Sequence, residues 1–198
     1  MNIKSHSKIK DIVIISSDKF KDDRGYFIET YQRNKIDSSE PIWFTETDGG
    51  GGYKITKKTW PPKPFVQDNF VSSIKNVIRG LHFQKDNPQG KLVRCISGII
   101  LDVAVDIRKG SNTYGEWISV ELSEENGDSL WIPEGFAHGY SVLSDTAKVL
   151  YKCTDIWYPD DESGIIWNDK TLNIDWKVLE SDAIVSDKDK KLKLFEEI

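Results

Sequence analysis

The chain has 198 residues, a formal net charge of −5 at pH 7, three histidines and two cysteines. A length near 200 predicts a single domain, 1–198, that is large enough to bury a core. The acidic balance argues against general binding to nucleic acid or an anionic membrane, and no apolar run approaches the roughly 18 residues of a membrane span.

Moving along the chain, the first irregular segment runs from about residue 45 to residue 64. Asp48 is followed by four glycines, and Trp60-Pro61-Pro62-Lys63-Pro64 places three prolines within four residues. Consecutive glycines cannot pack a core, and prolines interrupt the hydrogen-bond ladder of a sheet. The segment 45–64 is therefore predicted to be a Gly/Pro-rich surface loop inserted into the domain.

The middle of the chain alternates between apolar and polar residues. In Ile99–Arg108 the odd positions are all Ile, Leu or Val, whereas the even positions include Asp102 and Asp106. This pattern predicts a half-buried strand. Similar runs, separated by turn signals, are Lys91–Ser97, Trp117–Leu122, Ser129–Ile132, Gly139–Leu143 and Lys148–Thr154. Short strands at this spacing predict an all-β sandwich or barrel, with helical signals confined to the C-terminal third.

Cys95 and Cys153 each lie in one of these alternating runs. They are predicted to be buried, reduced thiols, because two isolated cysteines are too few for a metal site. The polar N-terminus has no apolar segment typical of a secretory signal, so the default location is the cytoplasm.

The segment Val77–Lys91 carries most of the candidate chemistry. It combines Arg79, His82, Gln84 and Lys91 with apolar residues and two glycines. Imidazole is the usual general base near neutral pH, although a lone histidine is more often a core residue bonded to the backbone. Because cations and an amide crowd the same stretch, we interpret His82 as a proton-transfer group beside an anion site.

The other charged and phenolic candidates have structural interpretations of comparable weight. Lys91 either points to water or stabilises negative charge on a carbonyl oxygen, an effect of about 3 kcal/mol in a dry site. Arg79 and Arg24 suit either a diphosphate or a surface ion pair. Tyr151, on an alternating strand, is either a buried structural phenol or a proton donor.

Asp189 and His138 are the least determined by their local sequence. Ser186 and Asp189 together fit a helix start, which accounts for Asp189 structurally; alternatively, Asp189 folds back to hold His82 in one tautomer. His138 and His82 lack an obvious third metal ligand in the sequence. His138 is therefore predicted to support the site or contact a substrate without a metal.

In these residues the chain resembles the dTDP-4-dehydrorhamnose 3,5-epimerase family of the cupin superfamily. The matching segments run in order through nearly the whole chain: Phe20–Glu29, Phe65–Asn69, Val77–Cys95, Asp102–Arg108, Leu130–Gly139, Tyr151–Thr154 and Ile166–Asp169. The resemblance implies a cupin-type jelly roll, usually a homodimer, that uses no metal or organic cofactor. The implied reaction inverts C3 and C5 of a nucleotide-linked 4-keto-6-deoxyhexose through an enolate.

The resemblance also implies a role for each candidate residue. His82 would be the base, Asp189 its partner, Lys91 the group that stabilises the C4 enolate, and Tyr151 the acid on the opposite face. Arg24 and Glu29 would lie in the N-terminal strand that in this family helps bind the nucleotide across the dimer. The complete implied substrate-binding set is Phe20, Arg24, Glu29, Gln67, Asn69, Arg79, His138 and Trp157.

Two features depart from the family pattern and leave the nucleotide and the sugar open. Ile156-Trp157 stands where the family often has two tyrosines, so Trp157 would stack on a base or a sugar in an altered pocket wall. The Gly-rich insertion from about 47 to 64 has no counterpart in the short family members and comes just before the Gln67–Asn69 segment, so it would reshape the pocket mouth. The alternatives are an epimerase that inverts only C3 or C5 of another keto sugar, a catalytically silent sugar-nucleotide-binding cupin, and a metal-dependent cupin enzyme. The silent protein would lack the base or the acid, whereas His82 and Tyr151 are both present.

Overall fold

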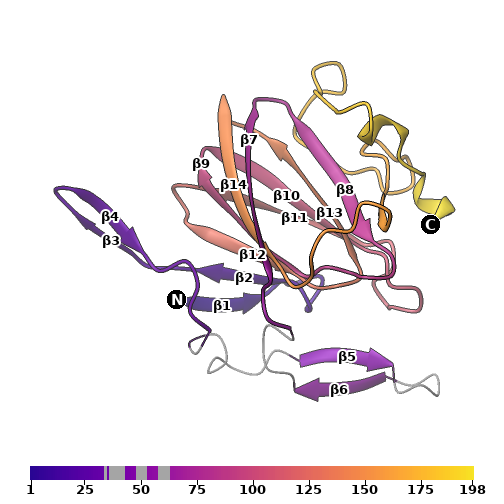
Figure 1. Cartoon of the computed structure of the whole chain (residues 1–198), viewed down its shortest axis with the longest axis horizontal. Coiled ribbons are helices and arrows are strands. Elements are labelled where there is room, and N and C mark those ends of the chain that lie inside the picture. The colour runs from indigo at the N-terminus through magenta and orange to yellow at the C-terminus, as the bar shows by residue number, and fades with distance from the viewer. Residues whose placement is uncertain (34, 36–42, 48–52, 58–62) are drawn as a thin grey trace.

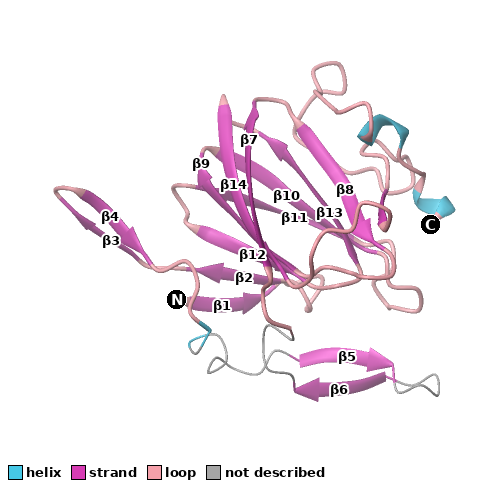
Figure 2. Cartoon of the chain, viewed as in Figure 1, coloured by secondary structure: helices cyan, strands magenta, loops and turns pink. Residues whose placement is uncertain are grey.

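The computed structural model describes residues 1–33, 35, 43–47, 53–57 and 63–198, with backbone alone for 43–47 and 53–57. Nearly all of the regular structure is β-strand (Figure 2). Two short 3₁₀ helices lie near the C-terminus: η1 (Asp189–Lys191) and η2 (Phe195–Glu197). The prediction of an all-β fold with short C-terminal helices is confirmed. In the described part of the chain, no helix has the length and apolarity needed to cross a membrane.

Two antiparallel sheets form the body of the molecule (Figure 1). The six-stranded sheet has the order β1 (Asn2–Ser5), β2 (Val13–Ser16), β12 (Asp128–Ile132), β9 (Lys91–Ser97), β14 (Thr146–Cys153) and β7 (Gln67–Ile74). The five-stranded sheet has the order β11 (Trp117–Ser123), β10 (Ile99–Asp106), β13 (Phe136–Val142), β8 (Ile78–Gln84) and β15 (Glu162–Gly164).

The main core lies between the sheets. It combines residues such as Val93 and Val149 from the six-stranded sheet with Ile100 and Phe136 from the five-stranded sheet. Because antiparallel strands alternate their side chains, the polar residues of the site share these inner faces with the core.

A second apolar layer covers the outer face of the five-stranded sheet. Leu101, Val103 and Val105 of β10 pack there against C-terminal residues that include Trp176 and Phe195. The yellow C-terminal segment in Figure 1 accordingly lies beside β8. The prediction that β10 is half-buried is therefore wrong: both of its faces are covered, and only its first residue is exposed.

Two hairpins lie outside the two sheets. The hairpin of β3 (Lys19–Asp22) and β4 (Gly25–Ile28) projects from the sandwich (Figure 1). The other pairs β5 (Trp43–Thr47) with β6 (Tyr53–Lys57) and overlaps the predicted insertion 45–64, beginning two residues before it. The four glycines after Asp48 and the Trp60–Pro62 part of the proline-rich run fall outside the described residues. The inserted loop and the single-domain organisation stay predictions.

A close backbone contact joins β8 to β13. The pairing register shifts between His138 and Tyr140, and Gly80 has φ of 112°. A Cβ at Gly80 would lie 2.6 Å from the His138 carbonyl oxygen, so only glycine fits this approach. At this irregularity His82 lies directly opposite His138.

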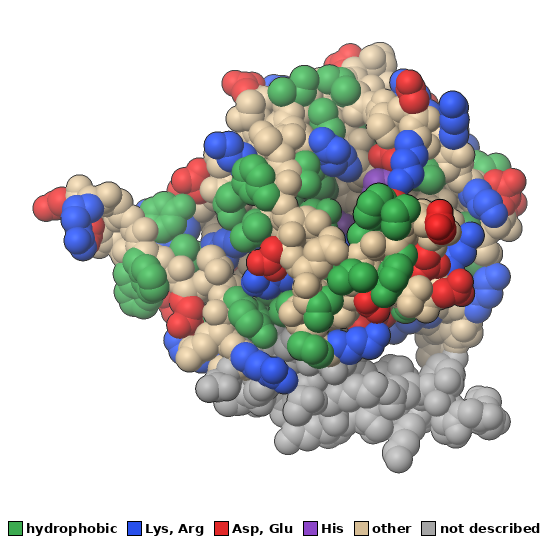
Figure 3. Space-filling model, viewed as in Figure 1, with side chains coloured by type: hydrophobic (Ala, Val, Ile, Leu, Met, Phe, Trp, Pro, Cys, Tyr) green, Lys and Arg blue, Asp and Glu red, His purple; other side chains and the backbone are tan. Residues whose placement is uncertain are grey.

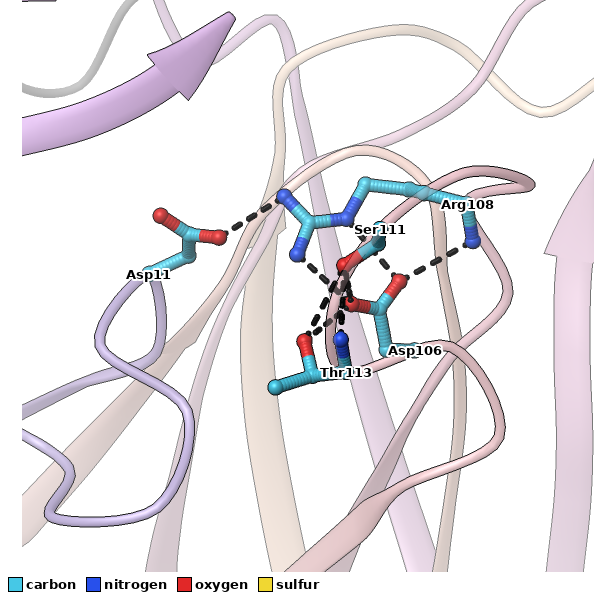
Figure 4. A network of polar contacts seen from close by, with 5 residues as sticks. All are labelled: Asp11, Asp106, Arg108, Ser111 and Thr113. Carbon is cyan, nitrogen blue, oxygen red and sulfur yellow. Dashed lines mark hydrogen bonds and ion pairs between the residues drawn. The ribbon is translucent and has the colours of Figure 1, made fainter. Parts of the chain in front are cut away.

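A compact polar network closes the end of β10 (Figure 4). The buried Asp106 carboxylate accepts hydrogen bonds from the backbone and guanidinium of Arg108 and from the hydroxyls of Ser111 and Thr113, at 2.6–2.9 Å. Arg108 also pairs with Asp11 at 2.7 Å. We call these five residues the Asp106 network; it ties the loop after β10 to the N-terminal arm.

Candidate active site

A cavity of about 330 Å³ opens between the two sheets. In Figure 3, imidazole surface is visible at the bottom of a hollow beside β8. The residues that line the cavity are Gln67, Asn69, His82, Phe83, Gln84, Gln89, Lys91, Tyr151, Trp157 and Glu162. Strand pairing explains part of this set, because Lys91 and Gln67 both lie opposite Cys153, and Tyr151 lies opposite Asn69. This volume is within the range of small-molecule sites.

His82, on β8, is joined to Asp189 of η1. Its Nε2 lies 2.8 Å from Asp189 Oδ1, and the second carboxylate oxygen accepts the backbone N–H of Gly80 at 3.2 Å. The Asp189 N–H donates to Ser186 Oγ at 3.0 Å. Asp189 thus has both features considered from the sequence: a local bond to Ser186 and a long-range bond to His82.

The protonation of this pair follows from the carboxylate. Burial alone would raise the pKa of Asp189, but the hydrogen bonds from His82 and Gly80 hold it below its usual value. The carboxylate is therefore ionised at neutral pH and accepts the proton of His82 Nε2. That leaves Nδ1 of a neutral His82 as the nitrogen with a free lone pair, as a general base requires.

His138 belongs to a second buried histidine–carboxylate pair. Its Nε2 lies 2.8 Å from Asp102 Oδ1. Burial lowers the pKa of His138, and the nearby charge of Lys91 lowers it further, against the opposing effect of Asp102. His138 itself does not line the cavity. No group of three His, Cys, Asp or Glu side chains suited to a metal gathers within the described ranges.

Lys91 lies at the start of β9 on the wall opposite His82. Burial lowers the pKa of its ammonium, against the attraction of Cys153, Asp102 and Glu162. None of these groups forms an ion pair with Lys91 in the part of the chain that the structure describes. A cation desolvated in this way interacts strongly with negative charge that develops nearby.

Tyr151 lies on β14, in the same wall as Lys91. Burial raises the pKa of its phenol to about 12. The phenol is therefore protonated at neutral pH and is available as a proton donor. His82 and Tyr151 come from different sheets, so an imidazole and a protonated phenol line opposite walls of one cavity.

Three further predicted residues lie at the cavity. Gln67 Nε2 donates to Asn69 Oδ1 at 2.9 Å, and Asn69 Nδ2 contacts Cys153 Sγ at 3.5 Å. Trp157 donates its backbone N–H to Gln67 Oε1 and its indole N–H to Glu162 Oε2, at 2.9 and 2.8 Å. Its side chain remains half-exposed at the cavity mouth.

The other predicted binding residues lie away from the cavity lining. Arg79 is exposed and bonds Ser73 Oγ at 3.1 Å. Phe20 and Arg24 lie on the projecting β3–β4 hairpin, where Arg24 pairs with Asp22. Glu29 follows this hairpin and pairs with Lys35 at 2.7 Å.

Gln84 lines the cavity, and sequence reasoning named it beside His82 without giving it a role. Sequence reasoning missed other residues of the site: Gln89 and Glu162 line the cavity, and Asp102 holds His138. Asp102 had a usable signal, because an acid in the middle of a strongly apolar alternating run needs a buried partner. Glu162 had none, since it follows Asp160-Asp161 in what reads as a solvated acidic turn.

The chain matches known proteins over nearly its whole length. The family model of dTDP-4-dehydrorhamnose 3,5-epimerase matches residues 6–197. The dTDP-4-dehydrorhamnose 3,5-epimerase of Methanothermobacter thermautotrophicus is 47% identical over 182 residues, covering 91% of this chain and 88% of that protein. The enzyme of the same name from Salmonella typhimurium is 47% identical over 177 residues, covering 89% and 86%.

A solved structure is similar in three dimensions as well. It is the dTDP-6-deoxy-D-glucose-3,5-epimerase of Legionella pneumophila in complex with dTDP-4-keto-L-rhamnose. The two chains are 41% identical with a TM-score of 0.86, and the match covers 100% of this chain and 94% of the other.

Proposed function

Because the chain belongs to the dTDP-4-dehydrorhamnose 3,5-epimerase family of isomerases, we propose that it inverts C3 and C5 of dTDP-4-dehydro-6-deoxyglucose. The product is dTDP-4-dehydrorhamnose. One observation carries the proposal: His82, which is bonded to Asp189, and the Tyr151 phenol line opposite walls of a single cavity. Inversion at a carbon needs a base on one face and an acid on the other.

His82 removes a proton from the carbon next to the C4 ketone. Its Nδ1 takes the proton, and the Asp189 carboxylate stabilises the imidazolium that forms while fixing the orientation of the ring. The electron pair of the broken C–H bond moves toward the ketone and gives an enolate.

Lys91 stabilises the enolate oxygen by its positive charge, an effect of about 3–4 kcal/mol in a site from which water is excluded. Tyr151 then donates its proton to the carbon from the opposite side, which inverts the centre. The electron pair of the enolate forms the new C–H bond as the ketone re-forms, and exchange with water then removes the proton from His82 and returns one to Tyr151. The same sequence at the second carbon completes the reaction, with no net change in atoms or electrons.

The remaining predicted residues bind the substrate. Gln67 and Asn69 contact the sugar, His138 supports the site from behind His82, and Trp157 stacks on the base. Arg79 and Arg24 bind the diphosphate through their planar guanidinium groups. The Legionella complex with dTDP-4-keto-L-rhamnose supports a dTDP-linked substrate.

We further propose that the protein is a homodimer. Exposed apolar side chains, including Phe70, Ile74 and Ile96, lie on the outer face of the six-stranded sheet. Figure 3 shows hydrophobic side chains over this β7–β14 face. Phe27 of the projecting hairpin is 68% exposed. A second copy would cover these surfaces and bring Phe20, Arg24 and Glu29 toward a partner's nucleotide.

The proposed setting is the cytoplasm, in keeping with two free, buried cysteines.

Sedimentation of the purified protein tests the dimer: the expected mass is twice that of one chain, and Phe70→Glu should shift it toward the monomer. A wild-type protein that sediments as a monomer would contradict the dimer.

Isotope exchange tests the reaction. The protein is incubated with dTDP-4-dehydro-6-deoxyglucose in deuterated water, and we expect deuterium at both C3 and C5. Label at one carbon only would reduce the activity to that of a mono-epimerase. Absence of label would refute this substrate, and a panel of CDP-, GDP- and UDP-linked keto sugars would then identify the nucleotide.

The Tyr151→Phe variant tests the acid separately. We expect it to retain slow exchange, because His82 can still remove the proton, but to lose most of its inverted product. Wild-type turnover in this variant would remove Tyr151 from the mechanism.

A further inference from the structure

The segment Asp155–Tyr158, which we call the lip, follows β14 and carries Trp157 at the cavity mouth. Its backbone is held by side chains from three separate segments. Gln89 Nε2 donates to the Asp155 carbonyl at 2.8 Å, and Gln67 Oε1 accepts the Trp157 N–H at 2.9 Å. The third segment contributes Gln84 of β8.

Gln84 forms hydrogen bonds to the lip on both sides of Trp157. Its Nε2 donates to the Ile156 carbonyl at 3.2 Å, and its Oε1 accepts the Tyr158 N–H at 2.8 Å. The same Nε2 donates to the Asn87 carbonyl at 2.6 Å. Gln84 is only 6% exposed, so loss of these bonds would leave buried polar groups without partners.

An amide is suited to this position for a chemical reason. A single planar group supplies a donor to one backbone carbonyl and an acceptor to a backbone N–H two residues further along the chain. A carboxylate has no donor for the Ile156 carbonyl, and a thioether has neither a strong donor nor a strong acceptor. Only a side chain with both functions fixes the peptides that flank Trp157.

The indole of Trp157 is held as well. Glu162 Oε2 accepts the indole N–H and also pairs with Lys188 at 2.7 Å. Burial alone would raise the pKa of Glu162, but Lys188 and Trp157 hold it below its usual value. The lip is thereby connected to the residue that precedes Asp189.

We propose that Gln84 is a positioning residue: through its two bonds to the lip it holds the Trp157 ring where a nucleotide base stacks, and so sets the affinity for the nucleotide. The proposal rests on the proposed function for the identity of that nucleotide. His82 lies two residues away on the same strand, yet Gln84 forms no bond to His82, Lys91 or Tyr151 among its contacts. Its loss should therefore weaken binding rather than chemistry.

The first experiment measures how fast the backbone amides of the lip exchange with solvent. Gln84→Met keeps the length of the side chain and removes its hydrogen bonds. We expect hydrogen–deuterium exchange of the Ile156–Tyr158 amides to become about tenfold faster, with exchange of the β9 amides unchanged. Gln32→Met is the matched control, because the Gln32 side-chain oxygen, unlike that of Gln84, has no hydrogen-bond partner among the described residues, and it should leave lip exchange as in the wild type.

The second experiment measures binding. For Gln84→Met we expect the KM for the dTDP-sugar and the Kd for dTDP alone to rise about tenfold, with kcat within about threefold of wild type. In a double-mutant cycle, Gln84→Met should add little to the loss already caused by Trp157→Ala, since both act through the same ring.

The outcomes separate this inference from the proposed function. Unchanged lip exchange in Gln84→Met overturns the positioning role even if the enzyme is an active epimerase. Additive effects with Trp157→Ala, or a fall in kcat at constant KM, also overturn it. A wild-type protein without isotope exchange refutes the proposed substrate, whereas the lip measurement still decides whether Gln84 holds Trp157. If Gln84→Met does not fold, Gln84→Glu retains the acceptor alone and should speed exchange of the lip by a smaller factor.

Discussion

The Asp106 network and the active-site cavity both place charged groups between the sheets, but they treat those charges in opposite ways. Asp106 receives five hydrogen bonds from Arg108, Ser111 and Thr113. Lys91 has no ion pair in the described chain and a lowered pKa. A buried charge with a full set of partners holds structure together, whereas one without partners has its field available to a ligand.

The same contrast appears in the acids. Burial alone would raise the pKa of Asp106, but hydrogen bonds from Arg108, Thr113 and Ser111 keep it low. All of those partners lie within the chain, so Asp106 has nothing left to offer a substrate. Asp189 also has a lowered pKa, but one of its partners is His82, whose Nδ1 has no hydrogen-bond partner among the described residues. A buried acid whose hydrogen-bond partners have no free group is predicted to be structural. A buried acid whose partner keeps a free nitrogen in a cavity is predicted to be functional.

The largest expected effect follows from His82→Asn. This variant removes the base and should lower the rate of isotope exchange at both C3 and C5 by about 10⁴-fold, while the melting temperature stays within a few degrees of wild type. His6→Asn, in the N-terminal arm and away from the cavity lining, should exchange at the wild-type rate. Substantial exchange in His82→Asn would place the base elsewhere.

Replacing Lys91 should lower the activity without lowering the stability. We expect Lys91→Met to lower exchange by about 10²–10³-fold and to leave the free energy of unfolding unchanged or about 1 kcal/mol higher, because it removes a desolvated charge. The alkaline limb of the exchange rate should lie below the ordinary lysine value of 10.5. It should disappear in any active Lys91→Arg enzyme, and a limb near 12 would instead assign it to Tyr151.

Asp106→Asn should give the opposite result. Breaking the Asp106 network should lower the free energy of unfolding by about 3 kcal/mol, or about 6–12 °C in melting temperature, with exchange by the folded enzyme within about threefold of wild type. A carboxyl with a lowered pKa stabilises the fold above its ordinary pKa of 3.8 and loses that contribution as pH falls through the folded value. The difference between wild type and variant should therefore narrow below pH 3.8, as measured by denaturant unfolding across pH.

Thr113→Val has the smallest expected effect among the variants that compare the Asp106 network with the active-site cavity. It removes one hydroxyl from Asp106 without changing side-chain shape, and should cost about 1 kcal/mol, or about 2–4 °C. A large loss of activity at unchanged stability would show that the Asp106 network reaches the active site and would break the distinction.

The sequence predicted strands well where period-two alternation was uninterrupted. Lys91–Ser97 was predicted with both bounds as observed, and Trp117–Leu122 ends one residue before β11 does. The error over β10 came from treating polar even positions as exposed. Asp102 and Asp106 face the interior because His138 and Arg108 provide partners there, and a pattern of hydropathy contains no information about such partners.

The site was predictable in residue type more than in geometry. His82 and Lys91 were found because they occur together in one short segment. The bond between His82 and Asp189 joins residues more than a hundred positions apart, and only the packing of the C-terminal segment on the five-stranded sheet creates it. Gln84 looked like an ordinary polar neighbour of His82, since its role depends on where the lip passes.

The pairing of β2 with β12 has a consequence for how the chain folds. Val13 lies opposite Trp131, and Ser16 lies opposite Asp128. β2 can therefore pair with β12 only after more than a hundred further residues have been synthesised. Pairing between such distant segments requires closing a long loop before any contact compensates for the lost entropy. Folding of this domain should therefore be slow, in milliseconds to seconds. During synthesis β1 and β2 can pair with each other, but the second edge of β2 would remain unpaired until β12 has left the ribosome.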